Sequence, residues 1–483
     1  MKILLLEPLC PPSAMWGSVK EQRGFLPPMG LLSIYTYLKH KTKHQVEFCD
    51  TQFGDISEED LTRKLQAERY ELIGIPVYTS TADNCFFTAK LCRQALPNAK
   101  IVFGNIHATS MPERTLAECP ECDFIIRHEG ELTLVELMEA LRQQGDFSGI
   151  LGLVWRQGQK IIINPPRTLI KNLDMLPVGL YDDLDLSRYV PHITNYVVLP
   201  NYPFVTQRGC PYRCTYCGAA NIMGKAIRRY STDRVIEELK ILKYDKGAKG
   251  LYFQDSTFTV NRHYTMELME KMIKEKLDLL WSCNTRTDRI DPELLAKMKA
   301  AGCRRVVIGI ESANQASLEV IKKGVTVEQQ TRAVQWVHEA RLKLMTSFIL
   351  CLPGETEEMV ANTIQYAKKL KGQIALFYLP VPYPGTKLYE YCKQTGLVRE
   401  DAAWSEYLSL DFDNPIYINP LIGKERMKYW YKRAFWEYYT SPGIWWKNLT
   451  AISGRHDFEI AYKGLHAWIN LSAKKMLHGL SKK

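Results

Sequence analysis

The sequence predicts an α/β fold made of an N-terminal doubly wound domain, a partial parallel barrel and a helical C-terminal region. Two observations lead to this prediction. Short apolar runs alternate with helix-like segments through residues 1–143, and a second such series begins near residue 202. Strands that alternate with helices imply right-handed crossovers and parallel sheets. Beyond about residue 395 the strand signal fades, and Trp, Tyr, Lys and Arg dominate.

The N-terminal series contains five predicted strands, each followed by a helix. The strands are KILLLEP, VEFCD, ELIGIPVY, KIVFG and DFIIRHEG, and the helices cover 29–41, 57–68, 82–95, 112–118 and 131–143. In a doubly wound sheet, ligands bind in the crevice at the carboxyl ends of the strands. Apolar and polar residues then alternate around a Gly-Gln turn in 151–164, which predicts a β-hairpin, and the proline-containing stretch 165–200 is interpreted as an irregular linker.

The second series predicts a barrel. Its strands are FVTQRG, GLYFQD, LLWSCNT, RRVVIGIES, LMTSFILCLP and IALFYLPVP, with helical stretches such as 232–243, 262–275 and 292–301 between them. Six βα units in roughly 190 residues match a partial parallel barrel better than an open sheet, and such barrels carry chemistry at the carboxyl ends of their strands. We therefore expect four regions, namely the doubly wound domain 1–145, the hairpin and linker 146–200, the barrel 201–395 and the helical, basic and aromatic region 396–483.

Composition narrows the class of protein. Among 483 residues, 46% are hydrophobic and 24% are charged, which excludes a largely disordered chain. The 13 scattered cysteines argue against the disulfide scaffold of a secreted protein. The short apolar run before Glu7 is typical of a first strand rather than a signal peptide, and no segment approaches the roughly 18 apolar residues that a transmembrane helix needs. We expect a cytoplasmic protein.

The net charge of +10 is uneven along the chain. Residues 424–483 combine many Lys and Arg with clustered aromatics, as in KYWYKRAFWEYY and IWWKN. This pattern fits a solvated helical tail as well as a surface for anionic lipid, nucleic acid or an acidic partner. A peripheral membrane contact is the binding role that we keep open, and we expect no nucleic-acid partner.

Three cysteines follow the first predicted barrel strand on one loop, TQRGCPYRCTYCGAA, at Cys210, Cys214 and Cys217. Three thiolates at this spacing can each take one corner of a [4Fe-4S] cubane, which leaves the fourth iron for an exogenous ligand. A structural zinc ion would want a fourth protein ligand, commonly from a second CxxC or HxxxH pair, and none is nearby. Arg208 and Arg213 would offset the negative charge of the cluster.

With this motif the sequence resembles the radical S-adenosylmethionine (SAM) superfamily, in which an aromatic residue such as Tyr216 precedes the last cysteine. The segments FQDSTF, CNTRTD, IGIESANQASL, FILCLPGET and PVPYPGTKLYE each resemble the matching segment of the cobalamin-binding radical SAM enzymes, the group of class B methyltransferases and anaerobic ring cyclases. The resemblance implies a [4Fe-4S] cluster and SAM, which is cleaved to a 5′-deoxyadenosyl radical while the barrel orients and shields it.

The resemblance also implies a SAM site at the carboxyl ends of the barrel strands. Arg286 has the position of an arginine that can pair with the SAM carboxylate, and Glu311 and Ser312 have those of a Glu-Ser pair that can contact its amino or ribose groups. Alone, these residues would fit a rim ion pair and a helix cap, but their place beside the cluster motif favours cofactor binding. Gln254 and Asp255 replace a more frequent pair of acids, and Asp255 keeps the polar role at the strand end.

The N-terminal domain resembles the cobalamin-binding domain of the same group, which implies that the loops after its third, fourth and fifth strands face the corrin. The implied contacts are Tyr78, Thr79, Ser80, Thr81, Gly104, Asn105, His107, Glu129 and Gly130. Asn105 stands where the family more often has a second glycine, so the backbone approach to the corrin differs there.

His107 is a candidate cobalt ligand. The chain lacks the Asp-x-His-x-x-Gly motif with which another cobalamin-binding class supplies an axial histidine. We therefore expect a loop histidine that is hydrogen-bonded within the protein or touches the corrin edge. Cys119 and Cys122 form a second CxxC without a matching pair, and we interpret them as structural thiols.

The commonest activity that the resemblance implies is methylation of an unactivated carbon. The deoxyadenosyl radical would abstract a substrate hydrogen, methylcobalamin would deliver a methyl group, and a second SAM would remethylate the cobalamin. The alternative is oxidative cyclisation or rearrangement with the same cofactors, and a third hypothesis, a non-catalytic iron-sulfur protein, would be recognised by the absence of SAM cleavage. The implied partners are an electron donor of the flavodoxin or ferredoxin type and an organic substrate, which the aromatic and basic tail permits to be a lipid, a large ring or a peptide.

Overall fold

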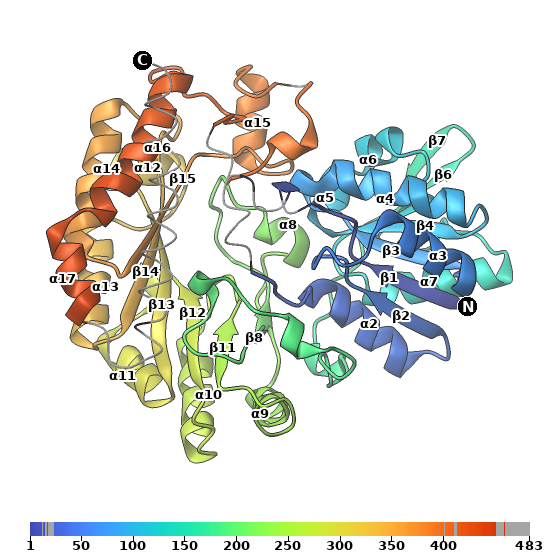
Figure 1. The fold of residues 1–483 in the computed structure, drawn as a ribbon, viewed down its shortest axis with the longest axis horizontal. Coiled ribbons are helices and arrows are strands. Elements are labelled where there is room, and N and C mark those ends of the chain that lie inside the picture. Colours follow the sequence, from blue (N-terminus) through green and yellow to red (C-terminus); the bar gives the residue numbers. More distant parts are fainter. Residues whose placement is uncertain are drawn as a thin grey trace.

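The computed structural model describes residues 1–11, 13–14, 17, 24–399, 401–409, 413–450 and 458, and it places two parallel α/β units side by side (Figure 1). The N-terminal sheet has the strand order β2-β1-β3-β4-β5-β6-β7. Its strands are β1 Lys2–Leu6, β2 Gln45–Cys49, β3 Leu72–Pro76, β4 Lys100–Gly104, β5 Phe124–Ile126, β6 Leu153–Gln157 and β7 Lys160–Ile163. Its helices are α2 Met29–Lys41, α3 Glu58–Glu68, α4 Ala82–Ala95, α5 Asn105–Ser110, α6 Pro112–Glu118 and α7 Glu131–Gln143.

Both faces of this sheet are buried, which explains why its strands are almost continuous apolar runs. Along β1, Ile3 and Leu5 pack on one side with apolar residues of α2 and α7, whereas Leu4 and Leu6 pack on the other with α3 and α4. Strands β1 to β5 are parallel, as expected for a doubly wound domain.

The hairpin expected in 151–164 is present as β6 and β7, and β6 pairs antiparallel with β5, so the hairpin extends the N-terminal sheet. The chain then crosses to the barrel through 165–200, which holds three short 3-10 turns at Leu173–Met175, Leu186–Arg188 and Ile193–Asn195.

The second sheet is the expected partial barrel of six parallel strands in the order β15-β14-β13-β12-β11-β8. The strands are β8 Asn201–Phe204, β11 Gly250–Phe253, β12 Leu280–Thr285, β13 Cys303–Glu311, β14 Lys343–Ile349 and β15 Ile374–Tyr378. The helices are α8 Ala219–Met223, α9 Thr232–Lys240, α10 Arg262–Lys274, α11 Pro292–Ala300, α12 Gln315–Val320, α13 Val327–Glu339, α14 Glu357–Leu370 and α15 Lys387–Gln394.

The bounds expected for the first barrel strand are wrong. Strand β8 ends at Phe204, and the segment β9 Gln207–Arg208 pairs antiparallel with β10 Arg228–Arg229 instead. The reason is that the backbone amides of Thr206 and Gln207 donate to the carboxylate of Asp255, which bends the chain out of the sheet.

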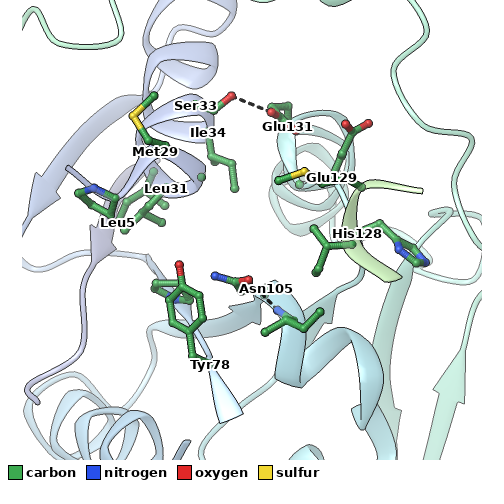
Figure 2. Close-up of a pocket in the computed structure, with 18 of the residues that line it drawn as sticks. Leu5, Met29, Leu31, Ser33, Ile34, Tyr78, Asn105, His128, Glu129 and Glu131 are labelled. Atoms are coloured by element: carbon green, nitrogen blue, oxygen red, sulfur yellow. Dashed lines mark hydrogen bonds between the residues drawn. The ribbon is translucent and has the colours of Figure 1, made fainter. Parts of the chain in front are cut away.

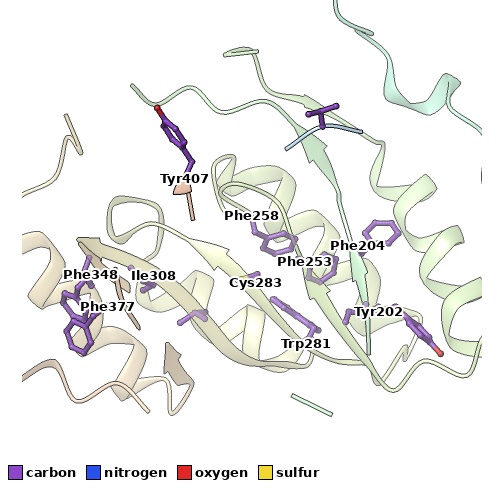
Figure 3. Close-up of a cluster of buried hydrophobic side chains, with 14 of the residues drawn as sticks. Tyr202, Phe204, Phe253, Phe258, Trp281, Cys283, Ile308, Phe348, Phe377 and Tyr407 are labelled. Carbon is purple, nitrogen blue, oxygen red and sulfur yellow. The ribbon is translucent and has the colours of Figure 1, made fainter. Parts of the chain in front are cut away.

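An aromatic core lies between the barrel sheet and its helices (Figure 3). Phe253 stacks on Phe258 with ring centroids 4.6 Å apart and meets the edge of Trp281 at 5.2 Å.

After the barrel, the chain continues into the helices α16 Lys424–Tyr439, which packs on α14 and β15, and α17 Pro442–Thr450. Across the described residues, we find no helix with the length and apolar character needed to cross a membrane.

Candidate functional site

The three motif cysteines lie on the loop between β9 and α8, at the carboxyl end of the barrel. Cys210 and Cys214 are partly exposed, Cys217 is exposed, and all three are free thiols. Within the described ranges, no group of three His, Cys, Asp or Glu side chains converges on a point where one metal ion would sit. A cubane makes a different demand, because each thiolate binds a different iron.

Two hydrogen bonds hold the backbone of this loop, and a glycine allows its sharp bend. The Cys210 amide donates to the Gly224 carbonyl at 3.0 Å, and the Thr215 amide donates to the Ile321 carbonyl at 2.9 Å. Gly209 has a φ of 105°, and a Cβ atom there would lie 2.2 Å from the Ala226 carbonyl oxygen, so only glycine fits. The loop is therefore shaped by the protein, and its thiols face a partly open space.

Glu311 lies at the end of β13 beside the cluster loop. Its φ of 69° is in the left-handed region, which costs a non-glycine residue on the order of 1–3 kcal/mol. Its carboxylate accepts from the Tyr216 hydroxyl at 2.9 Å and from Lys323 Nζ at 2.7 Å. Burial, followed by the charge of Glu311, raises the pKa of Tyr216 well above its ordinary value, so this phenol stays a donor.

Arg286 is buried directly under the same loop. Its guanidinium donates to Asp288 at 2.8 Å and to the Lys323 carbonyl at 2.6 Å, and Nη1 lies 3.9 Å from Cys214 Sγ. The Tyr212 ring lies 3.7 Å from the guanidinium carbon. The structure thus brings Arg286, Tyr216 and Glu311 together around the cysteine loop, as their strand-end positions suggested.

Ser312 and Asp255 are fully buried and take part in hydrogen bonds within the protein. Ser312 Oγ donates to Glu355 at 2.9 Å. Asp255 Oδ1 accepts from the amides of Thr206 and Gln207, and its Oδ2 has no hydrogen-bond partner among the described residues. Burial raises the pKa of Asp255 to about 7. Both residues hold the ends of strands that carry the site.

A cavity of about 910 Å³ opens at the carboxyl edge of the N-terminal sheet and reaches the barrel (Figure 2). Tyr78 and Asn105 point into it from the loops after β3 and β4. The expected contacts Tyr78, Thr79, Ser80, Thr81, Gly104, Asn105, Glu129 and Gly130 all line it. On the barrel side it is lined by Arg208, Gly218, Ala219, Gln254, Tyr383 and Pro384.

The lining of this cavity fits a large ligand with an apolar body and a neutral polar rim, as a corrin with its peripheral amides is. Leu5, Ile34 and Leu134 form an apolar wall, while hydroxyls and an amide stand at the sheet edge. Glu7, which the sequence reasoning missed, also lines the cavity, and burial raises its pKa to about 8, with the charge of Asp50 adding to the shift. A carboxyl that is largely protonated at neutral pH can donate to an amide oxygen.

His107 is fully buried behind the cavity and is not one of its lining residues. Its Nδ1 lies 3.4 Å from Thr79 Oγ1, and its ring meets Trp404 edge-on at 4.4 Å. Burial lowers the pKa of His107 to about 3, so the ring is neutral. This placement agrees with a histidine held within the protein.

Arg208 does not face the cluster as the sequence suggested. Its guanidinium crosses to the N-terminal domain, where it donates to Glu129 at 3.0 Å and to Glu131 at 2.8 Å. The sequence reasoning assigned no role to Lys323, Tyr212 or Glu355 either. Tyr212 and Glu355 stand within the motif segments TQRGCPYRCTYCGAA and FILCLPGET, and Lys323 stands outside them, but each acts through a contact that only the folded chain creates. Cys119 and Cys122 are buried free thiols, and burial raises the pKa of both.

Comparison with known families agrees with this division of the chain. Residues 204–367 match the Radical SAM superfamily, and residues 17–138 match the B12 binding domain. An uncharacterized methyltransferase of Pyrococcus horikoshii is 34% identical over 449 residues, which cover 93% of this chain and 95% of that protein. The anaerobic magnesium-protoporphyrin IX monomethyl ester cyclase of Rubrivivax gelatinosus is 27% identical, over 77% of this chain and 67% of the cyclase.

A solved structure shares the fold. The radical SAM methyltransferase TsrM from Kitasatospora setae, solved with cobalamin and a [4Fe-4S] cluster bound, superposes with a TM-score of 0.70. The two chains are 20% identical, and the match covers 91% of this chain and 89% of TsrM. The likeness confirms the predicted fold class.

Proposed function

We propose that this chain, which belongs to the cobalamin-dependent radical SAM enzyme family, methylates an unactivated carbon of an organic substrate. The family, the fold class and the cofactors expected from the sequence are confirmed: the cofactors are a [4Fe-4S] cluster, SAM and cobalamin. The observation that carries the proposal is the cavity shared by the two domains, because it brings the cobalamin-binding edge of one sheet to the cluster loop of the other.

When bound, the cluster with SAM supplies a radical that removes a substrate hydrogen atom, and cobalamin supplies the methyl group. In our proposal Cys210, Cys214 and Cys217 hold the cluster. Tyr216, Arg286 and Glu311 contact SAM, with Arg286 supplying the positive charge for the SAM carboxylate, while Asp255 and Ser312 hold the strand ends that carry the SAM site. The residues Tyr78, Thr79, Ser80, Thr81, Gly104, Asn105, His107, Glu129 and Gly130 contact or support the corrin.

Methyl transfer is favoured over cyclisation by the relatives. The Pyrococcus horikoshii protein, which matches along almost the whole chain, is named a methyltransferase, whereas the cyclase of Rubrivivax gelatinosus matches at lower identity and over less of its length. Oxidative cyclisation remains the alternative because it would use the same cofactors.

Product stoichiometry tests the choice between the two reactions. Methyl transfer consumes two SAM molecules and releases 5′-deoxyadenosine and S-adenosylhomocysteine in equal amounts. The reconstituted protein would be incubated anaerobically with dithionite, with SAM carrying a trideuterated methyl group and with an extract of small molecules. Dithionite supplies the electrons that SAM cleavage and cobalamin remethylation require. We expect equal amounts of both products and one metabolite heavier by the labelled methyl group. Formation of 5′-deoxyadenosine with a dehydrogenated, unlabelled metabolite would establish cyclisation instead.

We further propose that a small electron-transfer protein of the flavodoxin or ferredoxin type reduces the cluster. The exposed side chains of Cys217 and Arg213 support this, since they leave the cluster loop open to a partner and add positive charge for an acidic surface. Anaerobic reduction of the reconstituted protein by reduced flavodoxin, followed by EPR of the cluster, tests it.

We also propose a peripheral membrane contact through α16 and α17, which lie on the outer side of the barrel (Figure 1). In α16 Met427, Tyr431 and Tyr438 are buried, whereas the opposite face exposes Tyr429 and Trp436. Helix α17 exposes Trp446. Aromatic side chains with neighbouring basic residues suit the interface of an anionic membrane. The remainder of the basic and aromatic region, 451–457 and 459–483, lies outside the described residues.

Vesicle binding tests this contact. The full-length protein should cosediment with phosphatidylglycerol vesicles more than with phosphatidylcholine vesicles, and the double variant Trp436→Ser and Trp446→Ser should lose most of this binding. Tyr391→Ser is the matched control, because Tyr391 is an exposed aromatic residue on α15. Equal binding of the double variant and the wild type would remove this face from the proposal.

A further inference from the structure

Two arginines frame the loop that carries the three cysteines. Arg208 lies on β9, two residues before Cys210, and Arg228 lies on β10, after the loop has returned. The two residues are partners in the antiparallel β9–β10 ribbon. Both side chains leave the barrel and meet Glu129, on the loop between β5 and α7 of the N-terminal domain, and Arg208 also meets Glu131, the first residue of α7.

The contacts form one continuous network between the domains. Arg208 Nη1 donates to Glu129 at 3.0 Å, and Nη2 donates to Glu131 at 2.8 Å. Nη2 also donates to Ser33 Oγ at 2.9 Å, and Ser33 donates to Glu131 at 2.8 Å, the bond drawn in Figure 2. Arg228 Nη1 donates to both oxygens of Glu129, at 2.7 and 2.8 Å.

Because the network is buried, it is restricted to geometries in which every charge has a partner. The side chains of Glu131 and Glu129 are 3% and 7% exposed, and those of Arg208 and Arg228 are 13% and 8% exposed. Two cations therefore face two anions away from water, where an unpaired charge is strongly disfavoured. Burial raises the pKa of Glu131, but the charge and hydrogen bond of Arg208, together with hydrogen bonds from the Glu131 amide and Ser33, outweigh it and leave that pKa below its ordinary value, so the carboxylate stays ionised.

The network lies where the cobalamin cavity approaches the cluster loop. Arg208, Glu129 and Glu131 all line the cavity assigned to cobalamin, while the backbone of Arg208 leads directly into the cluster loop. A planar guanidinium that bridges two carboxylates fixes direction as well as distance. We propose that Arg208, anchored on Glu129 and Glu131, is a positioning residue that sets the place of the cluster loop relative to the cobalamin cavity.

This inference rests on the proposed function for its purpose, because a radical made at one cofactor must react with a group carried by the other. Small displacements between reacting groups are costly in such chemistry. It differs from the expectation that Arg208 offsets the charge of the cluster. Because the Arg208 guanidinium reaches the N-terminal domain and pairs there with Glu129 and Glu131, its removal should change the geometry between the cofactors more than the reduction potential of the cluster.

Pulsed EPR on the full-length protein tests the proposal. The sample carries the reduced cluster and cob(II)alamin, and the dipolar coupling between the two spins reports their separation. We expect one narrow distance distribution in the wild type and a broad or shifted distribution in Arg208→Gln, with iron and cobalamin contents unchanged. Arg208→Lys should recover part of the wild-type distribution, because it keeps the charge but not the planar fork. Glu131→Gln is a milder variant that should broaden the distribution without removing the arginine.

Arg93→Gln is the matched control. Arg93 is a partly buried arginine that bonds Asp123 and the carbonyls of Pro97 and Glu121, all within the N-terminal domain. The Arg93→Gln variant should lower the stability of the protein without changing the dipolar coupling between the cluster and cob(II)alamin. An unchanged distribution in both Arg208→Gln and Glu131→Gln would overturn the proposal, as would a shift of the cluster potential at constant distance. If Arg208→Gln fails to fold, Glu131→Gln and Ser33→Ala decide the question. These measurements need no substrate, so their result is separate from that of the methylation test.

Discussion

At the scale of single residues, Arg286 offers the sharpest test of the SAM site. Replacing it with lysine keeps the positive charge but loses the planar fork that can meet a carboxylate with two hydrogen bonds. Losing a hydrogen bond to a charged group costs about 1.5–3 kcal/mol, which corresponds to roughly one to two decades in affinity. SAM titration followed by EPR of the cluster should show this weakening in Arg286→Lys.

Cluster content separates a loss of SAM affinity from a loss of the cluster itself. Because Arg286 Nη1 lies 3.9 Å from Cys214 Sγ, the variant must also be checked for full iron and sulfide content. Arg289→Lys is a suitable control, since Arg289 contacts the same Tyr212 from an exposed position. Wild-type SAM affinity and wild-type 5′-deoxyadenosine formation in Arg286→Lys would leave Arg286 as a structural ion-pair residue.

His107 supplies a prediction about cobalt. Since the ring is buried behind the cavity against Trp404, we expect cob(II)alamin bound to the full-length protein to show no nitrogen superhyperfine splitting from a protein ligand. EPR of the wild type and of His107→Phe should therefore give the same cobalt signal. Splitting that disappears in the variant would identify His107 as a ligand.

The lowered pKa of His107 predicts that the stability of the protein depends on pH. The pKa of His107 is about 3 in the folded chain and 6.5 when solvated, so the unfolded chain binds the additional proton between these values. Its contribution to stability is complete above pH 6.5 and is lost as the pH falls, at up to about 1.4 kcal/mol per pH unit. Urea unfolding at pH 7 and pH 5 should show a smaller pH effect in His107→Phe; an equal effect would contradict the assignment.

At the scale of elements, we expect that the cluster can be removed from its loop without unfolding the barrel. Replacing Cys210, Cys214 and Cys217 together with alanine should abolish the [4Fe-4S] cluster, measured by iron analysis and Mössbauer spectroscopy. The barrel core around Phe253 and Trp281 contains none of these thiols, so far-UV circular dichroism should be unchanged. Full cluster occupancy in the triple variant would rule out this loop as the cluster site.

At the scale of the whole molecule, the cavity between the domains should couple their stabilities. Hydroxocobalamin at about 100 times its Kd should stabilise the state that binds it by about 2.7 kcal/mol. Because the ion-paired network around Glu129 spans both domains, we expect calorimetry to show one unfolding transition that moves to higher temperature as a unit. Two transitions, of which only one responds to the ligand, would show that the domains unfold independently.

The two α/β units with parallel sheets and the cysteine loop were predictable from local signals in the sequence: apolar periodicity, turn residues and the spacing of Cys210, Cys214 and Cys217. SAM and cobalamin were implied by the resemblance of its motifs to a known family. The convergence of Arg286, Tyr216 and Glu311 was also predictable, because the carboxyl ends of neighbouring parallel strands meet at one edge.

How the two units meet became visible only in the folded chain. The direction of Arg208, the burial of His107 against Trp404 and the pairing of Glu311 with Lys323 depend on residues that are distant in the sequence or carry no motif. A side chain next to the cluster motif could face either the cluster or the neighbouring domain. What settles this is the placement of Glu129 and Glu131 opposite Arg208, because buried charges adopt the geometry in which each finds a partner.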